Sequence, residues 1–385
     1  DSLNTTFANM GNKVAERFQN QPNDLKMKGM PSIYNFTMTK ISNKSIEKNI
    51  KRLNSNSSLD ILDIDSKLIQ TASSLLAPLL GKIFNMSLEL SEVVDDFKLA
   101  RVTPVYKGKG DHDDPNSYRP ISVSCHFAKL LEYEVNDQLM KYLLNHNFIS
   151  TDQSAYLKLH STVTSLHRVV DDWLENIDDE LYTAVCFLDI EKCFPSLNHS
   201  ILLKKLDWYG VRNEENKWFQ NYLSNRKQAV SLNNTLSQFE TVNIGVPQGS
   251  VLGPILFLIY INDLPQNVGN GISNMFADDV LLYATGRTIE ELNLKLQECV
   301  DHASTWYNQN VMTVSPIQQD TSGFCPPTLN GKQINIVDSY QYLGAYVDKH
   351  LKWNAQVGHI CKTVAGKLYT LRKLSKFLNK DLLSK

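Results

Sequence analysis

The sequence predicts a mixed α+β fold, and three observations lead to this prediction. An apolar run over residues 183–189 is typical of a buried β-strand, and it ends in a carboxylate, Asp189. Apolar, β-prone residues flank Asp278 and Asp279, which indicates an antiparallel hairpin with these acids at its turn. Other segments, such as 290–307, have helical spacing. Strands interleaved with helices and joined to an antiparallel hairpin are typical of α+β proteins.

The first half of the chain begins with an extension over residues 1–93, polar at first and helical towards Leu90. A strand is predicted over 99–106, because its apolar residues give way to a Gly-rich turn over 107–110. Residues 127–144 place Leu and Val side chains on one helical face and therefore predict a helix.

The second half of the chain alternates strands and helices. The strand over 183–189 is followed by a helix over 199–208. A loop rich in Gly and Pro over 245–254 runs into an apolar helix over 255–264, and the acidic hairpin follows. Residues 366–378 place Leu side chains at helical spacing among basic residues, which predicts an amphipathic helix.

Length and charge bound the organisation of the chain. Its 385 residues are enough for two or three domains with a sizeable core. The net charge of −2 argues against a uniformly basic surface, yet residues 348–385 hold nine Lys and Arg against two Asp, a local charge of +7. A basic helix of this kind is either a solvated face or a surface that grips a nucleic-acid backbone.

The cysteines and the apolar segments indicate the compartment. The six cysteines form no Cys-X-X-Cys pair and have no zinc-ligand spacing, which fits a reducing environment. Cys186 and Cys193 lie in apolar sequence and are expected to be packed thiols. No signal peptide opens the sequence, and the apolar segment near residues 75–84 is too short to span a bilayer. We therefore expect an intracellular protein, nuclear and cytoplasmic, that is neither secreted nor held in a membrane.

The three acids are candidate metal ligands. Neighbouring carboxylates repel one another unless a cation lies between them or one of them is protonated. Oxygen ligands without nearby His or Cys suit Mg²⁺, and two Mg²⁺ ions about 3.5–4 Å apart need acids from separate strands. Asp189, Asp278 and Asp279 have this distribution. The alternative is ordinary loop chemistry, since Asp is common in turns.

The loop over 245–254 is a candidate ligand contact. Its glycines permit a close approach of the backbone to a flat or phosphate-bearing ligand, and Gln248 can hydrogen-bond a sugar or a base edge. The alternative is a plain connection that precedes a buried helix.

Taken together, these segments resemble the reverse transcriptases of non-LTR (LINE-type) retrotransposons, of the jockey-like type. The resemblance runs from about residue 96 to residue 378 and rests on many short motifs in the family's order. These motifs are 101–107, 117–122, Gln153 with 160–162, Leu188-Asp189 with Lys192 and Phe194, Tyr222-Leu223 with Arg226 and Gln228, 245–264, 276–279 and 342–344.

The resemblance implies a right-hand polymerase with fingers, a palm and a partial thumb. Fingers and palm would cover residues 94–347, with an antiparallel palm sheet, and the basic helix would begin the thumb over 348–385. Residues 1–93 would form a mostly helical N-terminal extension.

The resemblance also implies an enzyme, an RNA-directed DNA polymerase that transfers nucleotides onto a primer 3′-hydroxyl. Asp189 and Asp278 would bridge two Mg²⁺ ions, with Mn²⁺ as an alternative, and Asp279 would assist them. The implied partners are an RNA template, a DNA primer or target, and dNTPs. No endonuclease is recognisable in the sequence.

Other residues take their roles from the same resemblance. Lys107 and Arg119 would bind the triphosphate, although each could also be an ordinary surface cation. Phe194 would exclude a ribose 2′-hydroxyl, or else be a core aromatic residue. Gln248 and Gly249 would contact the nascent pair or the template. The backbone of the nucleic acid would contact four basic residues, Lys367, Arg372, Lys373 and Lys376.

Departures from the family pattern predict weakened activity. Pro195 follows Phe194 where the family has Asp, and proline restricts the backbone of the residue before it. Gln318 replaces a lysine that is thought to give a proton to pyrophosphate, and loss of a general acid typically costs about 10²–10⁴-fold. Leu157 replaces an arginine. The alternative function is therefore a catalytically impaired or domesticated remnant that binds nucleic acid without efficient synthesis.

Overall fold

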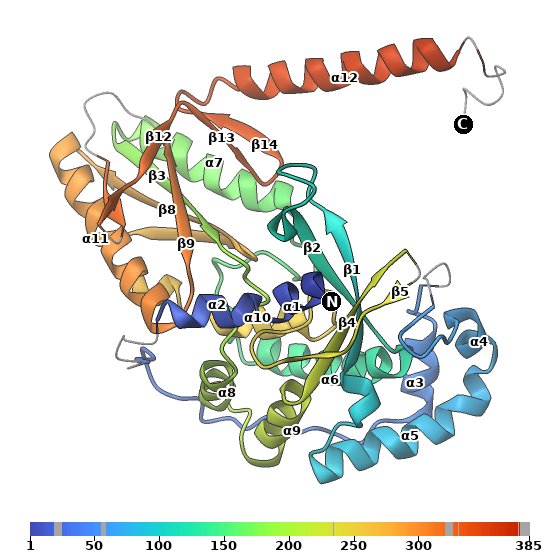
Figure 1. Cartoon of the computed structure of the whole chain (residues 1–385). Coiled ribbons are helices and arrows are strands. Elements are labelled where there is room, and N and C mark those ends of the chain that lie inside the picture. Colours follow the sequence, from blue (N-terminus) through green and yellow to red (C-terminus); the bar gives the residue numbers. More distant parts are fainter. Residues whose placement is uncertain are drawn as a thin grey trace. The chain divides into compact units, whose positions relative to one another are not determined.

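The computed structural model describes residues 1–18, 25–54, 59–233, 235–319, 326–329, 331–375 and 377 (Figure 1). Its contacts divide the chain into two compact units, each built from three separate stretches. Unit 1 contains Asp1–Tyr156, Ile190–Asn267 and Ala303–Val314, and unit 2 contains Leu157–Asp189, Val268–His302 and Ser315–Lys385. These units do not follow the boundaries predicted after residues 93 and 347, which stay a prediction.

Unit 1 combines a mixed sheet with helices. Its strands are β1 (Leu99–Tyr106), β2 (Tyr118–Ser124), β4 (Arg226–Leu232), β5 (Thr235–Leu236) and β6 (Glu240–Val242). They are ordered β2-β1-β4-β5, and β6 also pairs with β4. Strands β1 and β2 are antiparallel, whereas β1 and β4 are parallel. The helices are α1 (Ser2–Ala8), α2 (Met10–Glu16), α3 (Asn43–Ile50), α4 (Ser66–Thr71), α5 (Ser73–Leu90), α6 (His126–Asn145), α8 (His199–Trp208), α9 (Asn213–Leu223) and α10 (Gly253–Ile261), with short 3₁₀ turns at Asp95–Lys98, Pro115–Ser117 and Pro265–Asn267.

The first helices pack on this sheet. Phe7 of α1 lies in a buried cluster with Val102 of β1 and Val230 of β4. Asn4 donates a hydrogen bond from Nδ2 to the backbone oxygen of Gln228 at 3.1 Å. The polar start of the chain is therefore part of the core of unit 1, because a few apolar side chains and one buried amide fix it there.

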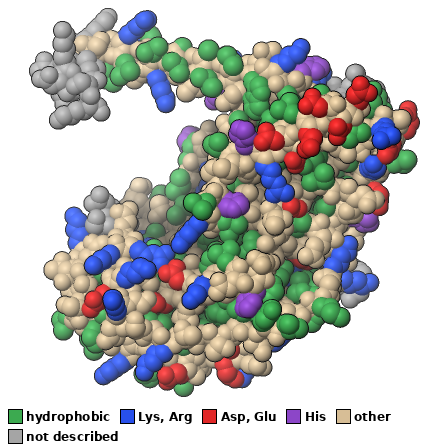
Figure 2. Space-filling view, turned by 180° about the vertical axis from the view of Figure 1, so that it is seen from behind, with side chains coloured by type: hydrophobic (Ala, Val, Ile, Leu, Met, Phe, Trp, Pro, Cys, Tyr) green, Lys and Arg blue, Asp and Glu red, His purple; other side chains and the backbone are tan. Residues whose placement is uncertain are grey.

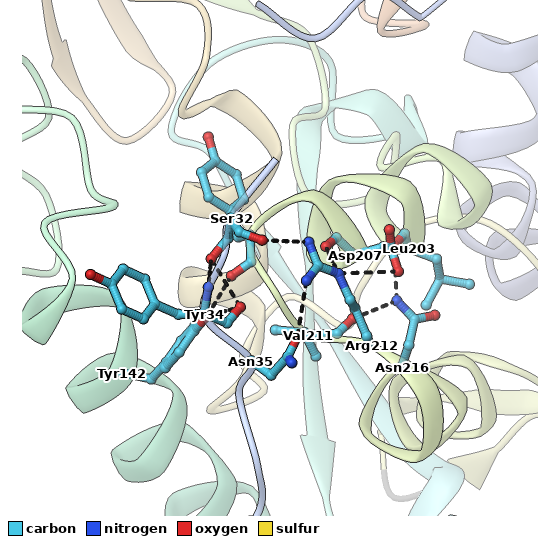
Figure 3. A network of polar contacts seen from close by, with 10 residues as sticks. Ser32, Tyr34, Asn35, Tyr142, Leu203, Asp207, Val211, Arg212 and Asn216 are labelled. Carbon is cyan, nitrogen blue, oxygen red and sulfur yellow. Dashed lines mark hydrogen bonds and ion pairs between the residues drawn. The ribbon is translucent and has the colours of Figure 1, made fainter. Parts of the chain in front are cut away.

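A polar network holds the irregular segment near residue 34 against the turn between α8 and α9 (Figure 3). Arg212 donates from Nη1 to Asn35 Oδ1 at 2.9 Å and from Nη2 to the backbone oxygen of Ser32 at 2.8 Å. Asn216 of α9 donates to the backbone oxygen of Leu203 at 3.0 Å. One guanidinium thus orders a stretch that has no helix or strand of its own until α3.

Unit 2 is built on a second sheet. Its elements are α7 (Thr162–Asp178), β3 (Tyr182–Ile190), β7 (Ile272–Phe276), β8 (Asp279–Gly286), α11 (Ile289–Gln309), β9 (Val314–Gln319), β10 (Thr328–Leu329), β11 (Lys332–Gln333), β12 (Asn335–Val337), β13 (Ser339–Tyr342), β14 (Ala345–Asp348) and α12 (Asn354–Leu374). The sheet order is β12-β9-β3-β8-β7, and β3, β8 and β7 are antiparallel neighbours. Strands β13 and β14 form a separate antiparallel pair.

Aromatic side chains form much of the core of unit 2. Phe187 of β3 lies in a buried cluster with Trp173 of α7 and Tyr342 of β13. Helix α11 packs so closely against the start of β7 that a Cβ atom on Gly271 would collide with Cys299 Sγ. The sheet is thereby held by helices and by the β13–β14 pair.

Most of the predicted elements are confirmed. Strand β1 and helix α8 have the predicted bounds, and α6 and α11 extend the predicted helices by only one or two residues at each end. The helix predicted over 255–264 instead spans Gly253–Ile261, since Pro254 is well tolerated in the first turn of a helix.

Helix α12 differs more from its prediction, because it begins at Asn354 rather than at residue 366. It buries none of its residues, and Figure 2 shows apolar side chains along its length. Lys367, Arg372 and Lys373 are exposed on it, whereas Lys376 lies outside the described residues. None of the described helices has both the length and the apolar character needed to cross a membrane.

Candidate active site

The acidic hairpin of unit 2 joins its two antiparallel strands by a two-residue loop. Phe276 at the end of β7 pairs with Asp279 at the start of β8, so that only Ala277 and Asp278 lie between them. Ala277 has a positive φ of 56°, as expected at the first loop position of a two-residue hairpin turn. The turn therefore places Asp278 at its second position and Asp279 on the strand.

Strand β3 brings the third acid to the same place. Asp189 is paired directly with Asp279 in the β3–β8 register. Opposed residues of antiparallel strands project to the same face, with Cβ atoms about 4.5–5.5 Å apart. The two stretches selected from the sequence, 183–189 and 276–279, are therefore adjacent in unit 2.

The three carboxylates interact electrostatically. Desolvation, followed by repulsion from Asp278 and Asp189, raises the pKa of Asp279 to about 6. In the part of the chain that the structure describes, no three His, Cys, Asp or Glu side chains form a ready metal-binding group. The metal-binding role of Asp189, Asp278 and Asp279 therefore stays a prediction, and the crowding of negative charge is the feature that a divalent cation would relieve.

A tyrosine that sequence reasoning missed lies beside these acids. The ring centroid of Tyr340 in β13 is 4.3 Å from that of Phe187, which precedes Asp189 by two residues and so shares its face of the sheet. Burial, then the charges of Asp189 and Asp279, raise the pKa of Tyr340. Its only signal in the sequence is its position two residues before Tyr342.

Two of the predicted nucleotide-binding residues lie on one face of the β1–β2 pair in unit 1. Arg119 is paired with Val105, and Lys107 follows Val105 by two residues, so both basic side chains project to the same side. Both residues are exposed. Lys107 donates from Nζ to the backbone oxygen of Asn116 at 2.7 Å.

The loop before α10 is fixed to β2. The backbone N–H of Ser122 donates to the backbone oxygen of Gln248 at 2.7 Å. Gly249 has a φ of 116°, and a Cβ atom there would lie 2.6 Å from the backbone oxygen of Ser122. The backbone conformation and the close contact with Ser122 are therefore enough to require glycine at position 249, even without a ligand.

Phe194 and Pro195 pack near the loop before α10 in unit 1. The ring of Phe194 is half-buried, 5.4 Å from the ring of Phe257 in α10. The backbone oxygen of Pro195 lies so close to Gly11 and Gly245 that a Cβ atom on either would collide with it. The departure at Pro195 is accommodated by glycines from two distant segments.

Further cations of unit 1 act electrostatically on Lys192. The pKa of Lys192 is lowered by burial and by the positive charges of Lys13, Arg17 and Lys107, while Glu191 opposes them. Arg17 Nη1 also lies 3.2 Å from Glu191 Oε2. Sequence reasoning missed Lys13, which lies in α2, and Arg17, which follows that helix directly. Positive charges that act on one another in this way favour an anionic ligand.

A comparison with protein families decides the identity of the chain. A family model described as reverse transcriptase (RNA-dependent DNA polymerase) matches residues 107–345. The chain belongs to the reverse transcriptase family. The matched range contains all three acids and the five predicted nucleotide-binding residues.

Individual reverse transcriptases place the chain among the mobile elements that its motifs resemble. It is 26% identical over 319 residues to the probable RNA-directed DNA polymerase from transposon BS of Drosophila melanogaster. The aligned region covers 77% of this chain and 34% of that protein. It is 27% identical over 317 residues to the RNA-directed DNA polymerase from mobile element jockey of the same species, with 77% of this chain and 34% of that protein aligned. It is 28% identical over 292 residues to the protein of that name from Drosophila funebris, with 71% of this chain and 31% of that protein aligned. The predicted jockey-like relationship is confirmed, and the chain spans about a third of the length of these relatives.

A buried glutamate anchors the loop that carries Gln248. Glu132 of α6 is 1% exposed, and its Oε2 accepts hydrogen bonds from the backbone N–H of Val251 at 2.6 Å and of Leu252 at 3.3 Å. Its Oε1 accepts a bond from Tyr222 Oη at 3.0 Å, and the charge of buried Arg226 opposes the rise that burial causes in its pKa. A carboxylate thus caps the start of α10 from another helix.

We expect Glu132→Gln to loosen this loop. The amide lacks the negative charge and offers only one acceptor oxygen, so the N–H groups of Val251 and Leu252 lose a charged partner, at a cost of about 1–3 kcal/mol. Hydrogen exchange read by mass spectrometry should therefore accelerate over residues 247–252. Glu134→Gln is the matched control, because Glu134 is also buried on α6 but binds Ser45 and Asn49. Equal acceleration in both variants would mean that Glu132 has no special role in this loop.

Proposed function

We propose that this chain carries out RNA-directed DNA synthesis. The observation that carries the proposal is the pairing of Asp189 with Asp279 beside Asp278, in a chain of the reverse transcriptase family. In this proposal the β1–β2 pair belongs to the fingers, the β3–β8–β7 strands belong to the palm, and α12 begins the thumb. An RNA template, a DNA primer and dNTPs are the partners.

The acids suit a pair of Mg²⁺ ions, or Mn²⁺ in their place. Asp189, Asp278 and Asp279 offer only oxygen ligands from two adjacent strands, and their mutual repulsion is a second reason to expect cations. When bound, such ions would make the primer 3′-hydroxyl more acidic and offset the charge on the leaving pyrophosphate.

The residues of unit 1 would bind the incoming nucleotide. Arg119 and Lys107 share a face of the β1–β2 pair, where a guanidinium and an ammonium can meet a triphosphate. Phe194 would act as the barrier to a 2′-hydroxyl, and Gln248 would contact the nascent base pair from a loop fixed to β2. Exposed Lys367, Arg372 and Lys373 of α12 would contact the backbone of the nucleic acid.

Primer extension tests the proposal. The chain is incubated with dNTPs, MgCl₂ or MnCl₂, and a labelled DNA primer annealed to an RNA or a DNA template. The primer should lengthen on the RNA template with the unaltered chain and with Asp178→Asn, which removes an exposed carboxylate at the end of α7. It should not lengthen with Asp278→Asn or with EDTA. Lengthening that persists in Asp278→Asn would refute the assigned site.

The second candidate function is binding without synthesis. The residues that favour it are Pro195 and Gln318, where the family pattern has Asp and Lys. Gln318 lies in β9, paired with Ile336 of β12, and the backbone of Pro195 packs against Gly11 and Gly245. Tight RNA binding with no extension on any template or metal would support this function instead.

A further inference from the structure

Helix α5 of unit 1 presents two apolar faces, although a helix on the outside of a globular unit usually needs only one. The inner face is buried and includes Ala77, Leu80 and Phe84. Asn85 also fixes the helix from this side, because it exchanges hydrogen bonds of 2.8 and 2.9 Å with the backbone of Ile41. This face therefore accounts for the attachment of α5 to its unit.

The outer face consists of large apolar side chains in water. Leu75, Leu79, Ile83, Met86 and Leu90 are 72%, 55%, 41%, 56% and 62% exposed. In Figure 1, α5 lies at the edge of the α3–α5 group, with this length of helix uncovered by other elements of unit 1. Five such side chains on one helix exceed the scattered apolar residues of an ordinary surface.

The spacing on the outer face is that of a coiled coil. Half-buried Leu76, followed by Leu79, Ile83, Met86 and Leu90, recurs at intervals of three, four, three and four residues. These are alternating a and d positions of the heptad, with Ile83 at a and Met86 at d. The stripe is about two heptads long and has the shape that packs against a second helix.

The charges beside the stripe select the partner and its direction. Exposed Lys82 and Glu89 both occupy g positions, and neither forms an ion pair with another described residue. In an antiparallel pair of identical helices, Ile83 meets Met86 of the other copy, and g positions face g positions, so Lys82 faces Glu89 twice. In a parallel pair Lys82 would face Ser87, which is uncharged and buried within its own unit.

We propose that α5 is a self-association surface that pairs two copies of this chain through an antiparallel α5–α5 contact. The contact is isologous, as expected for a twofold dimer. A single pair of 18-residue helices is small for a protein interface, so the dissociation constant should be on the order of 10 μM. This proposal is independent of the proposed synthesis.

Sedimentation equilibrium of the 385-residue chain over about 1–200 μM tests it. The unaltered chain should pass from monomer to dimer, and Leu79→Glu should remain monomeric, since it places a charge in the stripe. Lys82→Glu should weaken the dimer at least about tenfold, because two carboxylates would then face each other across the contact. Glu89→Lys should do the same with two ammonium groups. Both changes together should restore the dimer.

The charge reversal also guards against misfolding, because a variant restored by a second change has kept its fold. Lys48→Glu on α3 is the control for net charge, and it should leave the equilibrium unchanged. The proposal fails if the chain is monomeric throughout the concentration range, which would leave the stripe to a different partner. It also fails if a dimer forms that neither Leu79→Glu nor Lys82→Glu affects, which would place the contact on another surface.

Discussion

Replacing Asp189 by Asn is expected to lower the rate of nucleotide addition by about 10³-fold or more, with little loss of stability. The exposed carboxylate lies directly opposite Asp279, and Asn keeps its shape while removing the charge that the proposed ions need. A loss of this size corresponds to about 4 kcal/mol of transition-state stabilisation. Single-turnover primer extension measures it, and fluorescence anisotropy with labelled RNA measures whether binding persists.

Two further variants test whether the effect is specific to Asp189. Asp178→Asn removes a charge elsewhere in unit 2 and should keep the full rate, and Asp279→Asn should lose less than Asp189→Asn if Asp279 only assists. If Asp189→Asn lost RNA binding and thermal stability together with synthesis, the carboxylate would have a structural role, and its assignment to catalysis would be withdrawn.

Replacing Asp263 by Ala is expected to be the most destabilising single change. The side chains of Lys205 and Asp263 are 0% and 3% exposed, and Lys205 Nζ lies 2.6 Å from Asp263 Oδ1. Trp306 donates from Nε1 to Asp263 Oδ2 at 3.0 Å, and Lys205 also donates to the backbone oxygen of Tyr260. Removing one partner leaves a buried charge uncompensated, which typically costs about 3–5 kcal/mol. Urea unfolding followed by tryptophan fluorescence would measure the change.

The matched control is the exposed pair Lys217–Glu214, 2.7 Å apart, with side chains 64% and 62% exposed. Glu214→Ala should change the free energy of unfolding far less than Asp263→Ala, because water already solvates both charges of the exposed pair. Burial lowers the pKa of Lys205, and Asp263 opposes that effect. In Asp263→Ala the unfolded chain should therefore bind more protons than the folded chain, so the free energy of unfolding should rise as pH rises towards about 10.4. An equal decrease in the free energy of unfolding for Asp263→Ala and Glu214→Ala would contradict the structural importance of the buried pair.

The sequence was most informative where local patterns decide the structure. The run ending at Asp189 and the hairpin at 276–279 follow from apolar runs and turn chemistry, and their pairing needs only the adjacency of two strands. Helix α7 also has a local signal in the sequence, since Val169 and Trp173 lie four residues apart behind a capping box at Ser161.

The remaining features depend on residues that meet only after folding. No pattern in α6 distinguishes Glu132, which caps the loop before α10 from 119 and 120 residues away, from the other acids of that helix. The same holds for Tyr340, whose importance comes from its contact with Phe187. Short sequence motifs do not predict long-range contacts of this kind, because the residues that form them are far apart in the sequence.

The packing of α1 on the first sheet has a practical consequence for shortened forms of the chain. A version starting at residue 94 would strip Phe7 from Val102 and Val230 and would leave the backbone oxygen of Gln228 without the amide of Asn4. The apolar side chains on this face of the sheet would be exposed to water, so the shortened protein should aggregate on expression. The first sixteen residues therefore serve as a built-in solubilising cover for a sheet that lies almost a hundred residues further along.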